Sequence, residues 1–323
     1  MSVLVYTENW DGKFKKLSFE LVSYASELAR KLDTSSVALS IGNVTPEELI
    51  LLGKYGVKKI ISATNPNLGF LDSQVYTRII ADTVLREKAT VIILSNNNTG
   101  KALAPRLSVL LKAGIGSGVS KLPVNLDPFT VYKRAFSGNA FADVVIKSDI
   151  KIITLMQNSF QVIERDNDPV LENLPAEIPD GLLKTQVKDT QKQKGKILLT
   201  DAEIVVSGGR GMKSPDNWGP LVELAELLGA ATACSRPVSD EGWRSHEEHA
   251  GQTGKIIAPN LYIALGISGA TQHLAGVSSS KYIAAVNIDK DAPIFEAAQY
   301  GIIGDAKKVL PKLVEAVKEI KGK

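Results

Sequence analysis

Residues 261–289 read LYIALGISGATQHLAGVSSSKYIAAVNID, and this stretch decides the fold of the second half of the chain. Two apolar runs of strand character, Leu261–Ile267 and Tyr282–Ile288, flank a turn of small residues at 268–276. Small residues let the backbone approach a ligand closely, and the free N–H groups at a helix start suit a phosphate. His273 adds a titratable ring at the same place. The stretch therefore predicts a ligand site at the carboxyl end of a parallel sheet.

Three further turns in this half are rich in glycine or fixed by proline. Ser207–Gly211 lacks the GxGxxG fingerprint, but its Arg210 offers a planar donor fork suited to a pyrophosphate. Ser235-Arg236-Pro237 follows a short apolar run, and Gly251–Lys255 exposes polar groups between two glycines. Each turn alone is also compatible with a plain tight turn or a surface ion pair. Together they predict one elongated site along one edge of a parallel sheet.

The first half of the chain alternates apolar runs with segments of helical periodicity. This alternation predicts a parallel sheet covered by helices, with ligand space at the carboxyl ends of its strands. The polar loop 95–100 is either a binding loop or a solvated loop that caps the next helix. From 131 to 155 the pattern changes to short strands, which predicts an antiparallel edge or flap. The expected strands are 2–6, 37–41, 58–63 and 90–94, and the expected helices are 17–32, 46–55, 74–87 and 101–111.

Residues 165–196 interrupt this rhythm, because they are rich in proline and charge and poor in apolar periodicity. We interpret them as a linker with room for a short strand. The linker separates an N-terminal α/β domain, residues 1–164, from a C-terminal domain, residues 197–323. In the second domain we also expect strands at 203–206 and 231–233, and helices at 215–228, near 291 and at 306–320.

Composition narrows the class of protein. The 323 residues are 44% apolar and 23% charged, as in a globular protein, and are enough for two domains. A net charge of +3 spread along the chain gives no indication of nucleic-acid binding. One cysteine, Cys234, and three histidines leave no metal site in view, and Cys234 is interpreted as a core residue. No signal peptide and no apolar run of ~20 residues is visible, so we expect a cytoplasmic protein without a membrane span.

The order of these motifs resembles the electron transfer flavoprotein alpha subunit family. The resemblance is carried by 207–211, Ser235-Arg236, 251–255, 261–276, 284–287 and 292–305, and more loosely by 104–106 and 134–140 in the first half. It implies an N-terminal Rossmann-like sheet, similar to adenine-nucleotide hydrolases, and a C-terminal FAD-binding parallel α/β domain. One departure is His249, where the family often has glutamine.

The same resemblance implies an FAD site in the C-terminal domain. Arg210 and Ser235 would lie at the pyrophosphate, and Asn287 and Asp305 at the adenosine end. The isoalloxazine would be surrounded by Arg236, Thr253 at N5 and His273 at O2. Arg236 and a protonated His273 would supply positive charge that favours reduced flavin. The remaining residues expected to line FAD are Gln252, Ser268, Gly269 and Gln272.

The function implied by the resemblance is that of an electron carrier without catalytic residues of its own. It would form a heterodimer with an electron transfer flavoprotein beta subunit that binds AMP or a second FAD. Electrons would come from flavin dehydrogenases of the acyl-CoA dehydrogenase type, as in fatty acid beta-oxidation, and pass to a quinone reductase or another acceptor. Two alternatives remain open. One is a flavin- or nicotinamide-dependent oxidoreductase with a small substrate, and the other is an inert nucleotide-sensing module.

Overall fold

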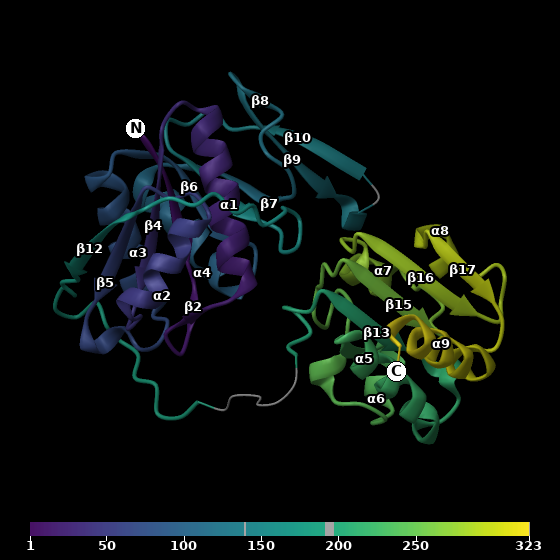
Figure 1. Ribbon diagram of the computed structural model, residues 1–323. Coiled ribbons are helices and arrows are strands. Elements are labelled where there is room, and N and C mark those ends of the chain that lie inside the picture. Colours follow the sequence, from purple (N-terminus) through teal and green to yellow (C-terminus); the bar gives the residue numbers. More distant parts are fainter. Residues whose placement is uncertain (139, 191–196, 323) are drawn as a thin grey trace. The chain divides into compact units, whose positions relative to one another are not determined.

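The computed structural model describes residues 1–138, 140–190 and 197–322, which form two compact units. The first contains Met1–Ala135 and Phe141–Thr190, and the second contains Phe136–Ala140 and the chain from Gln191 onward (Figure 1). Residues 191–196, part of the expected linker, lie outside the described residues. In the described part of the chain, no helix is long and apolar enough to cross a membrane.

A ten-stranded sheet organises the N-terminal unit, in the order β10-β9-β7-β11-β6-β1-β4-β5-β12 with β8 beside β9. From β7 to β12 all neighbouring strands are parallel. The strands are β1 (Ser2–Thr7), β4 (Ser35–Ile41), β5 (Lys59–Thr64), β6 (Ala89–Ser95), β7 (Gly114–Val119), β8 (Asn125–Leu126), β9 (Phe129–Ala135), β10 (Ala140–Val145), β11 (Lys151–Leu155) and β12 (Val170–Pro175), with a separate hairpin of β2 (Asn9–Trp10) and β3 (Lys13–Phe14).

Helices cover both faces of this sheet because side chains of a strand alternate between them. In β1, Val3 and Val5 pack into the core under α1, whereas Leu4 and Tyr6 pack into the core under α3 and α4. The helices are α1 (Lys16–Lys31), α2 (Pro46–Ile50), α3 (Ser73–Arg86) and α4 (Asn98–Leu111). The helix-covered parallel sheet expected from the sequence is thus confirmed.

The region 131–155 is only partly the antiparallel flap that the sequence predicts. β9 does pair antiparallel with β7 and β8. β11, however, lies inside the sheet and pairs in parallel with both β6 and β7. The sequence did not reveal this parallel pairing, because β11 is a buried strand of only five residues and a run that short fits either kind of sheet.

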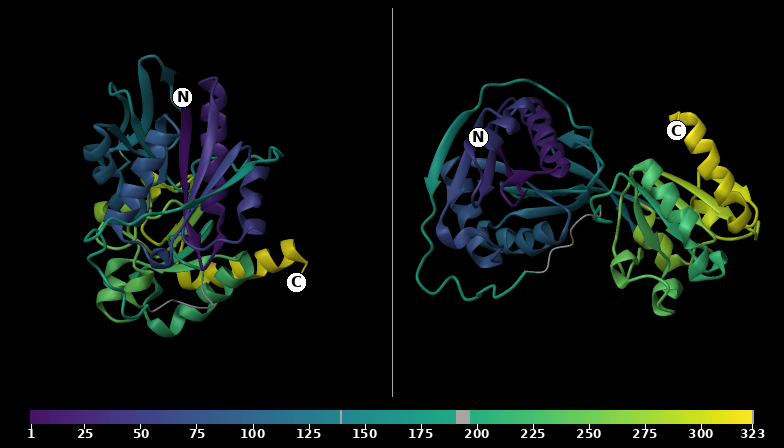
Figure 2. Two further views of the ribbon diagram at one scale, coloured as in Figure 1. Left: turned by 90° about the vertical axis from the view of Figure 1, so that its left-hand side faces the viewer. Right: turned by 60° about the horizontal axis from the view of Figure 1, so that its bottom comes forward.

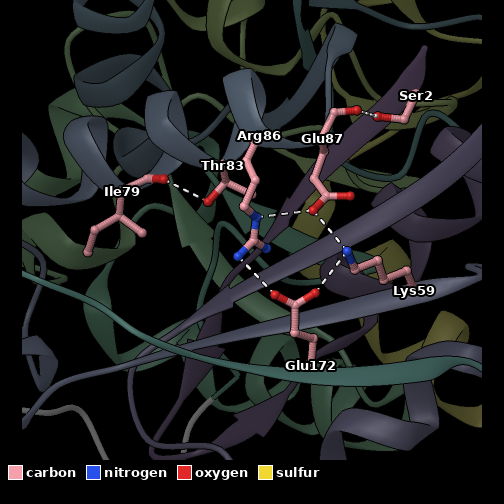
Figure 3. Close-up of polar contacts among 7 residues, drawn as sticks. All are labelled: Ser2, Lys59, Ile79, Thr83, Arg86, Glu87 and Glu172. Carbon is pink, nitrogen blue, oxygen red and sulfur yellow. Dashed lines mark hydrogen bonds and ion pairs between the residues drawn. The ribbon is translucent and has the colours of Figure 1, made fainter.

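β12 lies within the range expected to be a linker, and it extends the sheet along β5. A polar network holds its start (Figure 3): Glu172 accepts from Lys59 Nζ at 2.8 Å and from Arg86 at 2.8 Å. Lys59 also contacts Glu87 at 2.9 Å. The ammonium of Lys59 lowers the pKa of Glu172, so the pair stays ionised at neutral pH. Residues 170–175 therefore belong to the N-terminal unit.

The C-terminal unit is built on a five-stranded sheet in the order β14-β13-β15-β16-β17, parallel throughout. Its strands are β13 (Ile204–Gly208), β14 (Ala231–Cys234), β15 (Leu261–Leu265), β16 (Tyr282–Asn287) and β17 (Tyr300–Ile303). α5 (Gly219–Leu228) and α9 (Ala306–Lys321) pack on one face, as Figures 1 and 2 show, and α7 (Thr271–Val277) and α8 (Ile294–Ala297) on the other. The second parallel α/β domain is confirmed as well.

Candidate functional site

The carboxyl edge of the C-terminal sheet contains a topological switch point. The chain runs from β13 to β14 on one side and then crosses to β15 on the other side of β13. Loops that leave two adjacent strands in opposite directions open a crevice between them, and ligands of parallel α/β domains bind there. Arg210 follows β13, and Ser268 follows β15, so the sequence motifs 207–211 and 261–276 meet at this point.

Glycines bring the two loops into backbone contact. Gly209 N–H donates to the Leu265 carbonyl at 2.9 Å, and Gly211 N–H donates to the Gly266 carbonyl at 3.0 Å. A Cβ on Gly209 would stand 2.3 Å from the Gly266 oxygen, so no larger residue fits. These glycines serve loop packing first, and they leave the Arg210 side chain exposed at the edge.

The end of β14 adds Ser235 and Arg236 beside the β13 loop. Ser235 is 8% exposed, and its N–H donates to the Gly208 carbonyl at 3.1 Å. Arg236 begins α6 (Arg236–Asp240) and lies 3.3 Å from Asp240, with 62% of its side chain exposed. Such an exposed pair contributes little to stability, so the guanidinium remains available to a ligand.

The turn 251–255 does not follow a strand directly, unlike the turns after β13 and β14. It comes after a 3₁₀ turn at His246–Glu248 and reaches the edge through a parallel bridge between Cys234 and His249. Gln252 N–H then donates to the Gln272 carbonyl at 2.8 Å, which joins the turn to α7. Gln252 and Thr253 are exposed at its tip.

His249 forms the inside of this turn. Its ring is 7% exposed, and a Cβ on Gly254 would stand 2.7 Å from its Cγ and Nδ1. Its carbonyl accepts from Lys255 N–H at 2.8 Å. Burial, and then the nearby charge of Arg236, lower the pKa of His249, so the ring is neutral at neutral pH. His249, which stands where the family often has glutamine, therefore places a neutral imidazole ring in this turn.

His273 lies on α7 beneath the same turn and is 7% exposed. Its Nε2 is hydrogen-bonded to the Tyr262 hydroxyl at 2.8 Å, whereas Nδ1 makes no hydrogen bond to any described residue. Burial lowers the pKa of His273 to about 4, against the opposing effect of the Ala250 backbone. The protonated His273 expected from the sequence is thus wrong for the cofactor-free chain, because the apolar surroundings disfavour the charged ring.

Asn287 and Asp305 are placed at the same edge, but internal contacts occupy both side chains. Asn287 donates to the Ile267 carbonyl at 2.8 Å and accepts from Asp289 N–H at 3.0 Å. Asp305 caps α9 by accepting from Lys307 N–H, and its other oxygen accepts from Lys213 at 2.8 Å. Asn287 thus holds the loop after β16 against Ile267, and Asp305 holds the start of α9 against Lys213.

Sequence reasoning missed two residues of this edge. Lys213 closes the β13 loop onto Asp305, and its φ of +67° makes it the left-handed end of the turn after Arg210. Tyr262 orients His273 from inside β15. A lysine just after a glycine turn was a usable signal, but a tyrosine within a buried strand gives none.

The edge as a whole presents polar side chains on loops from several strands. Gly269, at φ +86°, turns the chain where a Cβ would stand 2.3 Å from the Ile294 nitrogen.

Cys234 is fully buried, and burial raises its pKa to about 12, which confirms it as a core thiol. Within the described ranges no cluster of His, Cys, Asp or Glu could hold a metal ion. The exposed polar residues at this edge include Arg210, Arg236, Gln252, Thr253, Ser268 and Gln272.

Two family models match the chain. The electron transfer flavoprotein domain matches residues 3–179, and the electron transfer flavoprotein FAD-binding domain matches residues 198–278. An electron transfer flavoprotein subunit alpha of Megasphaera elsdenii is 36% identical, over 99% of this chain and 97% of its own. That of Bacillus subtilis (strain 168) is 34% identical over 98% of both chains. An acryloyl-CoA reductase electron transfer subunit beta of Anaerotignum propionicum is 31% identical, over 98% of this chain and 95% of its own.

The parallel sheet, its switch-point loops and these matches define a flavoprotein whose C-terminal domain binds FAD. The chain belongs to the electron transfer flavoprotein alpha subunit family, and it is an alpha-type subunit involved in electron transfer.

The residues at the edge fit this cofactor. The buried Nδ1 of His273 makes no well-formed hydrogen bond among the described residues, although the Ala250 backbone lies near the ring. A hydrogen-bonding group placed there would satisfy it. The exposed guanidinium of Arg210 and the hydroxyls of Thr253 and Ser268 suit phosphate and ring heteroatoms.

Proposed function

We propose that FAD lies along the carboxyl edge of the C-terminal sheet and is held by residues from six segments at that edge. Arg210 and Ser235 bind the pyrophosphate, and Ser268, Gly269 and Gln272 line it from the β15 side. Arg236, Gln252, Thr253 and His273 surround the isoalloxazine, and Asn287 and Asp305 shape the adenosine end. The observation that carries this proposal is the switch point between β13 and β15, where Gly209 and Gly266 pack the two loops together.

FAD, when bound, takes up and releases electrons, and the chain sets how readily it does so. Arg236 brings a permanent positive charge with an exposed side chain. His273 contributes a neutral ring, since its pKa is lowered to about 4. It acts through hydrogen bonding at Nδ1, and Tyr262 fixes the ring from the other side.

We infer that the protein is a carrier without substrate chemistry. The three histidines of the C-terminal unit have other engagements: His249 is enclosed by its turn, His273 is bonded to Tyr262, and His246 is bonded to Ser239 at 2.8 Å. The exposed Asp240 at this edge is paired with Arg236 at 3.3 Å. A beta subunit that binds AMP or a second FAD is the proposed partner.

The proposed donors are flavin dehydrogenases that act on CoA thioesters, as in fatty acid beta-oxidation, and the acceptor is a quinone reductase or another redox protein. The name of the Anaerotignum propionicum relative, an acryloyl-CoA reductase electron transfer subunit, favours a partner of this kind.

The test is FAD binding by the full chain with Arg210→Ala. Loss of one charge-assisted hydrogen bond costs about 1.5–3 kcal/mol, so affinity should fall by roughly 10- to 150-fold. The matched control is Arg78→Ala, an exposed arginine of α3 paired with Asp82 in the other unit. Equal FAD affinity of both variants would exclude the proposed pyrophosphate site.

The alternative is an oxidoreductase with a small substrate. Turnover of a small hydroxy or thioester substrate by the purified flavoprotein alone, without a dehydrogenase, would favour it over the carrier.

A further inference from the structure

A second site lies in the N-terminal unit, where a pocket of about 510 Å³ opens at the carboxyl ends of β1 and β4. Its walls are the tip of the β2–β3 hairpin and the loops that follow β4 and β5. β1 lies between β4 and β6, so this is also the switch point of the larger sheet. The volume falls within the range of small-molecule sites.

The floor of the pocket is apolar and rigid. Tyr6, Ile41, Leu68 and Tyr76 line it and are at most 5% exposed. The rings of Tyr6 and Tyr76 meet edge to face at 6.2 Å, and the Tyr76 hydroxyl donates to the Leu68 carbonyl at 3.1 Å. Trp10 adds an indole wall from the hairpin. This lining suits a flat ring.

Polar groups surround that floor. Asn9 lines the pocket and donates to the Ile41 carbonyl at 2.9 Å, which fixes its amide. The buried carboxylate of Glu8 accepts from Asn97 at 2.9 and 3.1 Å and from Ser95. The rim carries Asp11 and Asn43. The loop 95–100 thus serves to hold Glu8 in place.

The negative charge of the pocket lining favours uncharged ligands over ligands that carry a phosphate. It contains two carboxylates, Glu8 and Asp11, and no lysine or arginine among the described residues that line the pocket. Within the lining a phosphate would therefore meet two carboxylates, whereas hydroxyl and amino donors would meet carboxylate and amide oxygens. Lys15, outside the lining, places its ammonium 4.1 Å from the centroid of the Trp10 ring.

We propose that this pocket binds an uncharged purine nucleoside, with the base against Trp10 and the tyrosine floor and the sugar hydroxyls toward the acidic rim. The site is separate from the FAD edge, because all of its lining belongs to residues 6–99.

The test is calorimetric titration of the FAD-loaded protein with adenosine and with AMP. Adenosine should bind more tightly than AMP. Trp10→Ala should weaken adenosine at least tenfold, as expected for loss of a stacked base. The matched control is Phe70→Ala, because Phe70 is 52% exposed on a neighbouring loop and does not line the pocket.

A second variant, Asn43→Trp, fills the mouth from the exposed rim and should abolish binding even where Trp10→Ala fails to fold. Adenosine affinity that is absent in the parent, or equal in Trp10→Ala and Phe70→Ala, overturns the site. Tighter Trp10-dependent binding of AMP than of adenosine overturns the choice of an uncharged ligand. FAD retention, measured in the same samples, reports separately on the C-terminal site.

Discussion

His273 links the electrostatics of the flavin edge to the stability of the fold. Its ring is buried and bonded to Tyr262, and its pKa is about 4 against 6.5 for an ordinary histidine. Between these two values the unfolded chain binds the proton and the folded chain does not. The free energy of unfolding therefore falls as the pH is lowered from 6.5 to 4.

We predict that this effect reaches about 2–3 kcal/mol between pH 7 and pH 4.5 in the cofactor-free chain. The His273→Gln side chain cannot titrate but can still form a hydrogen bond with Tyr262. Between pH 7 and pH 4.5, the free energy of unfolding of this variant should therefore fall by about 2–3 kcal/mol less than that of the parent. Urea unfolding of both proteins at the two pH values measures the difference. The carboxylates titrate in both proteins, so their contribution cancels when the two are compared. Identical pH dependence would mean that His273 is not buried as described.

His249 is expected to act as the internal support of the 251–255 turn. His249→Ala leaves a cavity between Gly251 and Gly254, and it should cost about 2 kcal/mol and speed amide exchange in the turn by tenfold or more. His249→Gln, which introduces the residue common in the family, should cost less than about 1.5 kcal/mol. Hydrogen exchange of residues 251–255 checks this. Unchanged exchange in the alanine variant would remove the supporting role.

For single residues, the sequence predicted which of them lie near one another, but it did not predict their protonation states. Arg210, Ser235 and Ser268 lie at one edge as the sequence predicts, because turns after parallel strands must share an edge. Thr253 reaches this edge in a turn that does not follow a strand directly. The neutral state of His273 could not be foreseen, since its lowered pKa depends on burial beneath the turn 251–255, which is distant from it in the sequence.

At the scale of elements, the contact between the loops after β13 and β15 determines the shape of the crevice. Gly209→Ala would place a Cβ 2.3 Å from the Gly266 oxygen and force the loops apart. We predict a loss of about 1–3 kcal/mol in stability from overpacking, with FAD affinity reduced at least tenfold. The control is Gly219→Ala at the start of α5, where a Cβ meets nothing within 4 Å. Flavin titration and thermal unfolding compare the two, and equal behaviour would refute the close contact.

Long periodic elements were predictable, and irregular ones were not. α1, α3 and α9 begin and end within two residues of the periodicity that predicts them, because each has a continuous apolar face. The four-residue strand β17 gave no signal, since all of its residues are exposed. β12 was not evident in a range rich in proline and charge, although it pairs with β5 along its whole length and its Glu172 adds ion pairs.

At the scale of the whole molecule, we propose that residues 165–196 separate two domains that fold independently. The described part of this range after β12 contains no further helix or strand up to Thr190. Limited proteolysis should therefore cut after β12 first and release a C-terminal fragment from about residue 197. A first cut within β13 to α9 would contradict the division.

The chain should also require a partner. Several large apolar side chains are exposed on α3 and α4 of the N-terminal unit: Leu85 at 63%, Val109 at 82% and Leu110 at 50%. Exposed apolar side chains on two packed helices are typical of an interaction surface, and an obligate interface buries more than ~2,000 Å². We expect the beta subunit to cover this one.

Expressed alone, the chain should be poorly soluble or lose FAD, and co-expression with the beta subunit should restore both. Val109→Lys should weaken the heterodimer at least tenfold, because it places a charge in an apolar interface. Ile320→Lys is the matched control, since Ile320 is 84% exposed at the end of α9 in the other unit. Size-exclusion chromatography and flavin absorbance of the co-purified pairs measure the outcome. A monomer that keeps stoichiometric FAD and takes electrons from a dehydrogenase unaided would refute the requirement for a partner.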